Sequence, residues 1–399
     1  MMLADALVVI MISVGLVLAI PAVILLLEVL ASLFYVDADV QASAGRPRIG
    51  VLVPAHNEAS TIVDTLASIR SQLAGGDRIV VIADNCTDET ATIARASGAE
   101  AIVRTDGLRR GKGYALDFGI RHLAQDPPTV VIVIDADCQP SPGCLGTIAS
   151  LAAATQRPVQ AHDRIVPPPG GRSPYLSVAS LAVRVKNLSR PLGCRRLGLA
   201  CQLMGTGMAF PWAIIDKVDF ATSEIVEDLT YGLKFARAGH APLFCPSASV
   251  VSEFPVSLEG QTTQRERWEA GHLHIIATQV FPMILNAVRR ADFVLLALAL
   301  DAAVPPLAFF TLAIAAFAVV SVPIALLANA PVLLSLALAV TAILGCAVML
   351  AWWRVGRDVI SFRDMTLSVP RYVLSKLGVY GHALIGRKIE WIRTKRGNN

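Results

Sequence analysis

The sequence predicts an α/β domain with a mostly parallel, Rossmann-like sheet, joined to transmembrane and interfacial helices. Between residues 48 and 250, short apolar runs rich in β-branched residues alternate with segments of helical spacing. That alternation is typical of strands buried on both faces of a parallel sheet. Hydrophobic residues make up 54% of the 399 residues and charged residues only 17%. A soluble domain is usually about a quarter charged, so this balance favours a membrane protein.

Three transmembrane helices are expected. Residues 6–27 form an uncharged run that is long enough to cross a hydrocarbon core of ~30 Å. No basic residue precedes it, so an anchor fits better than a removable signal peptide. Residues 302–353 carry no charge and exceed twice the length of one span, with a natural break at 328–331. We therefore expect an N-terminal anchor within residues 1–35 and two further helices over 302–353.

The distribution of Lys and Arg predicts the orientation. Arg46 and Arg48 follow the first span, and residues 354–399 are rich in both cations, whereas the first five residues carry neither. Positively charged segments stay in the cytoplasm, so the α/β region, taken as residues 36–280, is expected on the cytoplasmic face of the inner membrane. The segment 281–301 and the tail mix cations with apolar residues, which predicts helices on an anionic membrane surface. A solvated basic helix is the alternative for both.

The cysteines and the net charge exclude some classes of protein. The seven cysteines form no CxxC pair, which argues against a disulfide framework and against a structural zinc site. A net charge of +4 is too small to predict a nucleic-acid partner. The charge of individual segments is therefore more informative than the total.

Each polar motif in the α/β region follows a predicted strand. In doubly wound sheets, ligands bind beyond the carboxyl ends of the strands, so these motifs are expected to meet at one edge. The predicted strands are 49–53, 79–83, 101–104 and 130–134. The helical segments between them are 59–74, 88–97 and 113–123.

The first three motifs suit a nucleotide. Pro54, His56 and Glu58 follow the first strand, and Asp84 follows the second, where it is placed to accept hydrogen bonds from a base or ribose. Helix capping is the alternative reading of the Asp84 segment. Lys112 lies between two glycines, so backbone and cation can approach a phosphate, although such a segment is otherwise only a loop and lacks the Walker spacing.

Asp135 and Asp137 form the most informative motif. They end a buried strand at alternate positions, so both carboxylates lie on one face of an extended chain. Two neighbouring acids repel each other unless a cation compensates, and Mg²⁺ or Mn²⁺ prefers a few carboxylates together with phosphate oxygens. A solvated acidic loop is the alternative.

Two further motifs follow later in the chain. Glu227 and Asp228 begin a helical pattern, which suits either favourable charge at a helix start or a general base in Asp228. Gln264, Arg267 and Trp268 lie on one segment, in which Arg267 can bind a diphosphate in a bidentate manner and Trp268 offers a plane to a sugar ring. An amphipathic helix is the alternative for this segment.

Taken in order, these residues resemble the family 2 glycosyltransferases, which have a GT-A fold. They are most similar to the membrane-bound branch that includes the cellulose, chitin, hyaluronan and poly-N-acetylglucosamine synthases. The family pattern is an Asp after the second strand, then DxD, (E/D)D and QxxRW. It is matched here by Asp84, Asp135 with Asp137, Glu227 with Asp228, and Gln264 with Arg267 and Trp268.

The resemblance implies a role for each residue. Asp84 would contact uridine, Asp135 and Asp137 a metal and the diphosphate, and Asp228 would be the base of an inverting transfer. Gly205 and Thr206 resemble the acceptor-side loop of the synthases, and the QxxRW residues would contact acceptor or diphosphate. The implied partners are a nucleotide-sugar donor, for which the resemblance favours a UDP-sugar, a lipid-linked or glycan acceptor, and membrane lipids, with no nucleic acid.

The number of spans bears on the product. Synthases that extrude their own polymer have more spans than the three expected here, which favours addition of one or a few sugars over processive β-glycan synthesis, unless the chain acts as an oligomer or within a polysaccharide-assembly complex. A catalytically silent scaffold is disfavoured because every carboxylate of the pattern is present. Transport is disfavoured because ionisable residues are lacking inside the expected spans.

Overall fold

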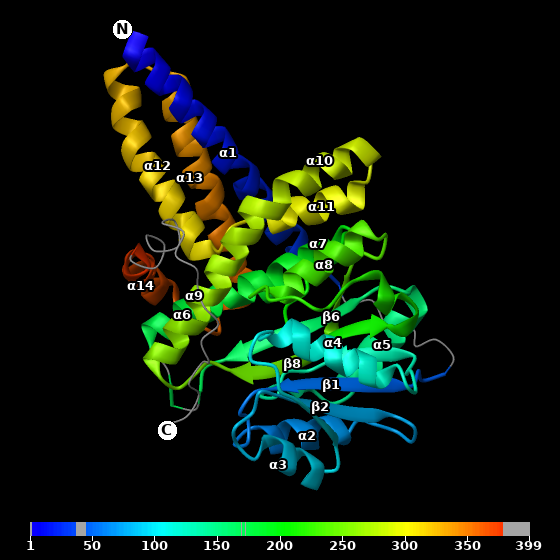
Figure 1. Cartoon of the computed structure of the whole chain (residues 1–399). Helices are drawn as coiled ribbons and strands as arrows, with labels where there is room; N and C mark the ends of the chain where they lie inside the picture. Colours follow the sequence, from blue (N-terminus) through cyan, green and yellow to red (C-terminus); the bar gives the residue numbers. More distant parts are fainter. Residues whose placement is uncertain (1, 37–44, 169, 172, 378–399) are drawn as a thin grey trace.

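The computed structural model describes residues 2–36, 45–168, 170–171 and 173–377 (Figure 1). Within these residues, one eight-stranded sheet has the order β3-β2-β1-β4-β7-β6-β8-β5. Its strands are β1 (Ile49–Ala55), β2 (Arg78–Asp84), β3 (Glu100–Arg104), β4 (Val130–Val133), β5 (Gln139–Pro140), β6 (Val159–Val166), β7 (Met208–Pro211) and β8 (Leu243–Glu253). The expected tail beyond residue 377 lies outside the described residues.

The first half of the sheet is parallel, as expected, and the second half is mixed. β1 lies between β2 and β4 and runs parallel to both, and β2 is also parallel to β3. β7 is antiparallel to β4 and β6, whereas β6 and β8 are parallel. Between β6 and β7 the chain forms two helices, α6 (Pro174–Arg184) and α7 (Arg190–Arg196). β7 nevertheless pairs antiparallel with both of its neighbours, and regular βα alternation, which is typical of parallel strands, could not predict this reversal.

Helices cover both faces of the sheet and form a three-layer domain. One core cluster joins β1 and β4 to α2 (Ile62–Arg70), α3 (Thr90–Ala96) and α5 (Cys144–Thr155). A second cluster joins the opposite face to α4 (Lys112–Leu123) and α8 (Glu227–Arg237). The strands are buried on both sides because their apolar, β-branched residues are continuous rather than alternating.

Long apolar helices extend from this domain (Figure 1). α1 (Met2–Leu33) packs beside α13 (Pro331–Ala351), and α13 packs beside α12 (Leu307–Leu327). Among the residues that the structure describes, four helical stretches are long and apolar enough to cross a membrane: Asp5–Leu33, Glu259–Arg290, Leu307–Leu327 and Pro331–Gly356. The three expected spans are among them. Glu259–Arg290 is the additional candidate and is the least apolar of the four.

The additional candidate is one long helical stretch. It comprises α9 (Leu258–Ile275), a π-helical turn and α10 (Phe281–Arg290). The boundary we expected at residue 280 therefore falls inside a continuous helical stretch. α10 packs against α11 (Phe293–Ala302) in a cluster that also includes α8. α10 and α11 cover the segment expected to form an interfacial helix.

α1, which is expected to anchor the chain in a membrane, packs closely against the sheet domain. α7 (Arg190–Arg196) crosses α1 at Gly193, where a Cβ atom would lie only 1.9 Å from the carbonyl oxygen of Glu28. Beside this contact, Arg190 donates to Glu28 over 2.7 Å and also pairs with Asp301 on α11. All three side chains are buried. A charged cluster therefore links α1, α7 and α11.

Candidate active site

A polar cavity of about 250 Å³ lies beyond the ends of the central strands. It contains the DxD and (E/D)D residues, Lys112, the Gly-Thr loop and the QxxRW residues. The residues expected in the site that line it are Lys112, Asp135, Asp137, Gly205, Thr206, Glu227, Asp228, Gln264, Arg267 and Trp268. Motifs that are far apart in the sequence therefore share one cavity, as the ordered pattern predicted.

The DxD segment begins where β4 ends. Ile134 still donates to Leu52 of β1, and the Asp135 backbone then donates to Thr206 Oγ1 over 3.2 Å. Asp135, Asp137 and Cys138 offer ligand atoms within 4.8 Å of one another. Burial raises the pKa of the Cys138 thiol well above its usual range, so this thiol stays protonated. The two carboxylates are therefore the groups that fit a hard divalent cation.

Lys112 links three parts of the cavity. It begins α4 directly after Gly111, whose φ of +127° favours glycine. Its Nζ lies 2.6 Å from Asp135 Oδ1 and 3.7 Å from Glu227 Oε1, and it donates to the Gly205 carbonyl oxygen over 2.8 Å. Burial lowers the pKa of Lys112, but the charges of Asp135 and Glu227 outweigh burial and raise it above its usual value. Lys112 is therefore a permanent cation.

Glu227 and Asp228 occupy the first turn of α8. Glu227 is buried, and burial raises its pKa to about 7. The pKa of Asp228 is also raised, chiefly by burial. A Cβ atom on Gly205 would lie 3.5 Å from Asp228 Oδ2 and 3.7 Å from Lys112 Nζ, so the loop backbone closely approaches both groups. A carboxylate whose pKa is raised towards neutrality is a better proton acceptor than an ordinary aspartate.

The QxxRW residues enter the cavity from α9. Gln264 is buried, and Arg267 and Trp268 are half-buried. Trp268 also lines a second, apolar pocket. Arg267 and Trp268 therefore both line the polar cavity, and the indole of Trp268 lies between this cavity and the apolar pocket.

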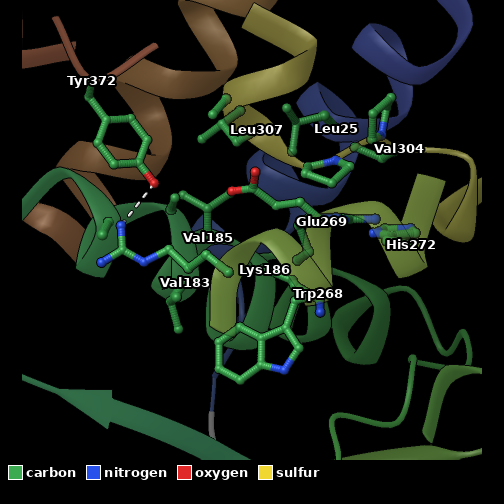
Figure 2. A pocket seen from close by; sticks show the side chains of 17 residues that line it. Leu25, Val183, Val185, Lys186, Trp268, Glu269, His272, Val304, Leu307 and Tyr372 are labelled. Carbon is green, nitrogen blue, oxygen red and sulfur yellow. Dashed lines mark hydrogen bonds between the residues drawn. The ribbon is translucent and has the colours of Figure 1, made fainter. Parts of the chain in front are cut away.

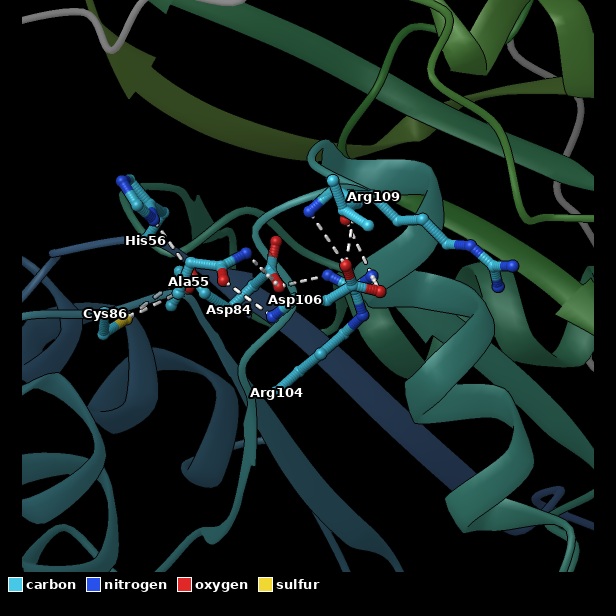
Figure 3. Close-up of polar contacts among 9 residues, drawn as sticks. Ala55, His56, Asp84, Cys86, Arg104, Asp106 and Arg109 are labelled. Carbon is cyan, nitrogen blue, oxygen red and sulfur yellow. Dashed lines mark hydrogen bonds and ion pairs between the residues drawn. The ribbon is translucent and has the colours of Figure 1, made fainter.

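Four of the residues expected to bind the nucleotide-sugar do not line this cavity: Pro54, His56, Glu58 and Asp84. Pro54 is near the end of β1, His56 and Glu58 follow that strand, and Asp84 ends β2. Figure 3 shows His56 and Asp84 close together. His56 Nδ1 lies 2.7 Å from the carbonyl oxygen of Asp84, and Arg104 donates to Asp84 Oδ1 over 2.6 Å. Arg104 also pairs with Asp106 and donates to the carbonyl of Arg109. This network connects Asp84 to the loop that leads to Lys112.

Three further cavity residues were missed by the sequence reasoning. Asp163 on β6 is buried, and it accepts from Asn187 Nδ2 over 3.0 Å through Oδ2. Burial and the charge of Asp135 raise the pKa of Asp163 to about 7. Lys186 and Asn187 lie on a π-helical turn between α6 and α7. Such turns are frequent at functional sites, but no sequence pattern marked this one. The polar triplet 162–164 inside a strand was the signal that could have indicated Asp163.

The architecture is that of a GT-A glycosyltransferase: a Rossmann-like half-sheet, a mixed extension and an acidic cavity at the strand ends. The chain belongs to the glycosyltransferase-like family 2, whose family model matches residues 47–271. This match includes the DxD, (E/D)D and QxxRW segments.

Two relatives illustrate the similarity. Glucosyl-3-phosphoglycerate synthase of Mycobacterium tuberculosis is 41% identical over 103 residues, which cover 24% of this chain and 30% of that protein. An uncharacterized glycosyltransferase of the same organism is 30% identical over 189 residues, covering 42% of this chain and 82% of that one. The chain spans only 30–38% of the length of the first curated relatives it matches.

A solved structure extends the likeness in fold. The mannosyltransferase PcManGT from Pyrobaculum calidifontis, in complex with GDP-Man and Mn²⁺, superposes with a TM-score of 0.53 at 20% identity. The alignment covers 88% of this chain and 98% of that chain. It therefore includes helices beyond the sheet domain as well as the GT-A fold itself.

Proposed function

We propose that this chain is an inverting glycosyltransferase that moves a sugar from a nucleotide-sugar, with a UDP-sugar as the expected donor, to an acceptor at the cytoplasmic face of the inner membrane. The acceptor is a lipid-linked or polysaccharide molecule in glycolipid or cell-surface glycan synthesis. The observation that carries the proposal is the single cavity containing Asp135, Asp137, Lys112, Asp228 and Arg267. Acids for a metal, cations for a leaving diphosphate and a candidate base thus face one space.

In the proposed transfer, Asp228 accepts the proton of an acceptor hydroxyl while that oxygen attacks the anomeric carbon. The bond from the anomeric carbon to the diphosphate breaks, so the configuration inverts. Lys112 and Arg267 bring positive charge to the departing diphosphate, the type of stabilisation that contributes most in such sites. Glu227 lies 3.7 Å from Lys112 and so helps to orient its ammonium.

Asp135 and Asp137 are the residues that would hold a divalent ion. Their paired carboxylates fit Mg²⁺ or Mn²⁺ by ligand type, and PcManGT was solved with Mn²⁺. A bound ion would neutralise charge that develops on the diphosphate. Asp84 and its network of contacts with His56 and Arg104 would form the base-side part of the donor site.

Transfer of labelled sugar tests the proposal. Purified full-length protein is incubated with a panel of labelled nucleotide-sugars, Mn²⁺ or Mg²⁺ and a native lipid extract, and label is then measured in the organic and polymer fractions. The proposal expects label from one donor in a product that forms only when divalent metal is present. Product length separates addition of single sugars from processive synthesis. Absence of both product and released nucleotide with every donor would overturn the proposal.

A further inference from the structure

An apolar pocket adjoins the catalytic cavity on its membrane side. It measures about 100 Å³ and lies among α1, α6 (Pro174–Arg184), α9, the start of α12 and α14 (Phe362–Ser375). In Figure 2, Leu25, Val304 and Leu307 lie on one side of the pocket and Trp268 on the opposite side. Three residues line both this pocket and the catalytic cavity: Val183, Lys186 and Trp268.

Most of the lining is aliphatic. Its apolar members are Leu25, Ala179, Ala182, Val183, Val185, Val304, Pro305, Pro306, Leu307 and Ala308. Methyl and methylene groups of this kind favour a hydrocarbon chain over a sugar, whose hydroxyls would lose their hydrogen bonds to water. The lining helices α1, α9 and α12 belong to candidate membrane spans, so a lipid chain has a short route into the pocket.

Two positively charged side chains, Lys186 and Arg265, line the apolar pocket, and Lys186 also lines the catalytic cavity. Among the residues that the structure describes, Lys186 forms no ion pair, and it is exposed to both spaces. Arg265, 4% exposed, lines the apolar pocket, and within the described chain its Nε and Nη2 make no hydrogen bond. Its Nη1 donates to the Tyr372 hydroxyl over 3.2 Å. The guanidinium carbon lies 4.9, 5.2 and 5.9 Å from the ring centroids of Tyr175, Phe254 and Tyr372, so aromatic faces stabilise its charge. They do not replace hydrogen-bond acceptors for Nε and Nη2, and these two donors are available to the oxygens of a ligand.

The other charged groups of the pocket are already compensated. Arg190 pairs with Glu28 and Asp301, and Glu269 pairs with Lys376 over 3.3 Å. Lys186 and Arg265 therefore remain as the positive groups that an anion can meet. Oxygens of a phosphate are well matched to a lysine beside an arginine.

We infer that the acceptor is a sugar linked through a phosphate to a long hydrocarbon chain. The chain occupies the apolar pocket, the phosphate meets Lys186 and Arg265, and the sugar stacks on Trp268 with its hydroxyl towards Asp228. This inference rests on the proposed transferase function and adds the class of acceptor and its site. The order of surfaces, apolar, cationic and then acidic, matches the order of the three parts of such a molecule.

Binding of tritiated undecaprenyl phosphate to the full-length protein in detergent tests the site. Leu307→Trp fills the apolar pocket and is expected to weaken binding about tenfold or more. Val319→Trp is the matched control on the same helix, because Val319 is 74% exposed, and should bind like wild type. Equal binding by Leu307→Trp and wild type would overturn the inference.

The competitors distinguish the sources of the phosphate. Lys186→Met should lose most of the preference for undecaprenyl phosphate over undecaprenol. Inorganic phosphate should compete poorly, because it gains nothing from the apolar pocket. If it competes as well as the lipid, the cations form a site for free phosphate and the inference is wrong. If undecaprenol binds wild type as tightly as its phosphate, the cationic junction has no role and the inference is also wrong.

Two additional measurements keep the test decisive. A photoreactive undecaprenyl phosphate on wild-type protein should label the peptides that contain Leu25 and Leu307; labelling elsewhere only would contradict the site even if Leu307→Trp fails to fold. Transfer of labelled sugar to the native lipid extract is measured in parallel. Normal transfer by protein that does not bind undecaprenyl phosphate rejects the acceptor site alone, whereas absence of both product and released nucleotide in wild type with every donor rejects the proposed function.

Discussion

Lys112 Nζ lies 2.6 Å from Asp135 Oδ1 and 3.7 Å from Glu227 Oε1, so one ammonium links the DxD motif to the helix that carries the candidate base. The same Nζ also donates a hydrogen bond to the Gly205 carbonyl oxygen, so Lys112 contacts the loop of Gly205 and Thr206 as well. Lys112 thus positions three motifs that the sequence separates widely. We regard this cation as the structural centre of the site.

Replacing Lys112 should therefore affect more than a single contact. Lys112→Met leaves Asp135 and Glu227 without their shared cation, and we expect transfer to fall roughly 100-fold or more, the range found when one electrostatic stabiliser is removed. Steady-state nucleotide release measures this. Lys217→Met is the control, since that side chain is 53% exposed, and should retain full activity. Equal activity of both variants would disprove the role of Lys112.

The Asp228→Asn variant should still bind the nucleotide-sugar donor but should not transfer its sugar. The amide keeps the shape of the side chain yet accepts no proton, and loss of a general base reduces rates by about 10²–10⁴-fold. Donor binding is followed by calorimetry and transfer by product label. Normal turnover in this variant would remove Asp228 as the base.

Asp137→Asn should weaken the binding of a divalent metal ion and, through the metal, the binding of the nucleotide. In wild type, Mn²⁺ with UDP at about 100 times its Kd should stabilise the folded state by about 2.7 kcal/mol. Thermal unfolding with and without EDTA measures this increment. The variant should lose most of it, and an unchanged increment would argue against a metal at Asp137.

Asp163 should make stability depend on pH. Because burial raises its folded pKa from 3.8 to about 7, the folded state holds this proton more tightly than the unfolded chain. The contribution of Asp163 to the free energy of unfolding therefore falls as pH rises from about 4, and it levels off above about 7. At high pH and in EDTA, the free energy of unfolding of Asp163→Asn should exceed that of wild type by at most on the order of 4 kcal/mol.

Glu100→Gln is the control for that prediction. A hydrogen bond from Arg78 lowers the pKa of Glu100 to about 2, so its stabilising effect is present above pH 4.5 and lost only in acid. Between pH 5 and 8 the carboxylate of Glu100 keeps its charge, so the difference in unfolding free energy between Glu100→Gln and wild type should change much less than for Asp163→Asn. Any change that remains comes from the neighbouring His122, which lies 3.0 Å from Glu100 Oε2. Parallel pH profiles for Asp163→Asn and Glu100→Gln would contradict the assignment for Asp163.

The cluster of Glu28, Arg190 and Asp301 should hold the anchor to the catalytic domain. Arg190→Met leaves two buried acids without a partner, and breaking a buried pair in this way costs about 3–5 kcal/mol. Thermal unfolding in detergent measures the loss. Arg184→Met removes a bridge to Asp358, which is 69% exposed, and should cost at most about 1 kcal/mol. Similar losses in both variants would contradict the structural role of Arg190.

The sequence was most informative where chemistry is local. The end of β4 just before Asp135 and the start of α8 at Glu227 follow from apolar runs that stop at acids, and the motifs were expected beyond the ends of strands. The π-helical turn with Lys186 was not predictable, because it depends on packing between α6 and α7. The direction of β7 also depends on tertiary structure. For His56 and Asp84, the predicted role in nucleotide binding stays a prediction.

Release of nucleoside diphosphate tests directly whether this chain is a metal-dependent glycosyltransferase in which Asp228 is the base. Wild type and Asp228→Asn are compared side by side on a panel of nucleotide-sugars, with lipid extract, and with Mn²⁺ either present or removed by EDTA. The account predicts release from one donor by wild type with metal only, and almost none by the variant, although both bind that donor. Equal release by the two proteins, or release that EDTA leaves unchanged, would contradict the account.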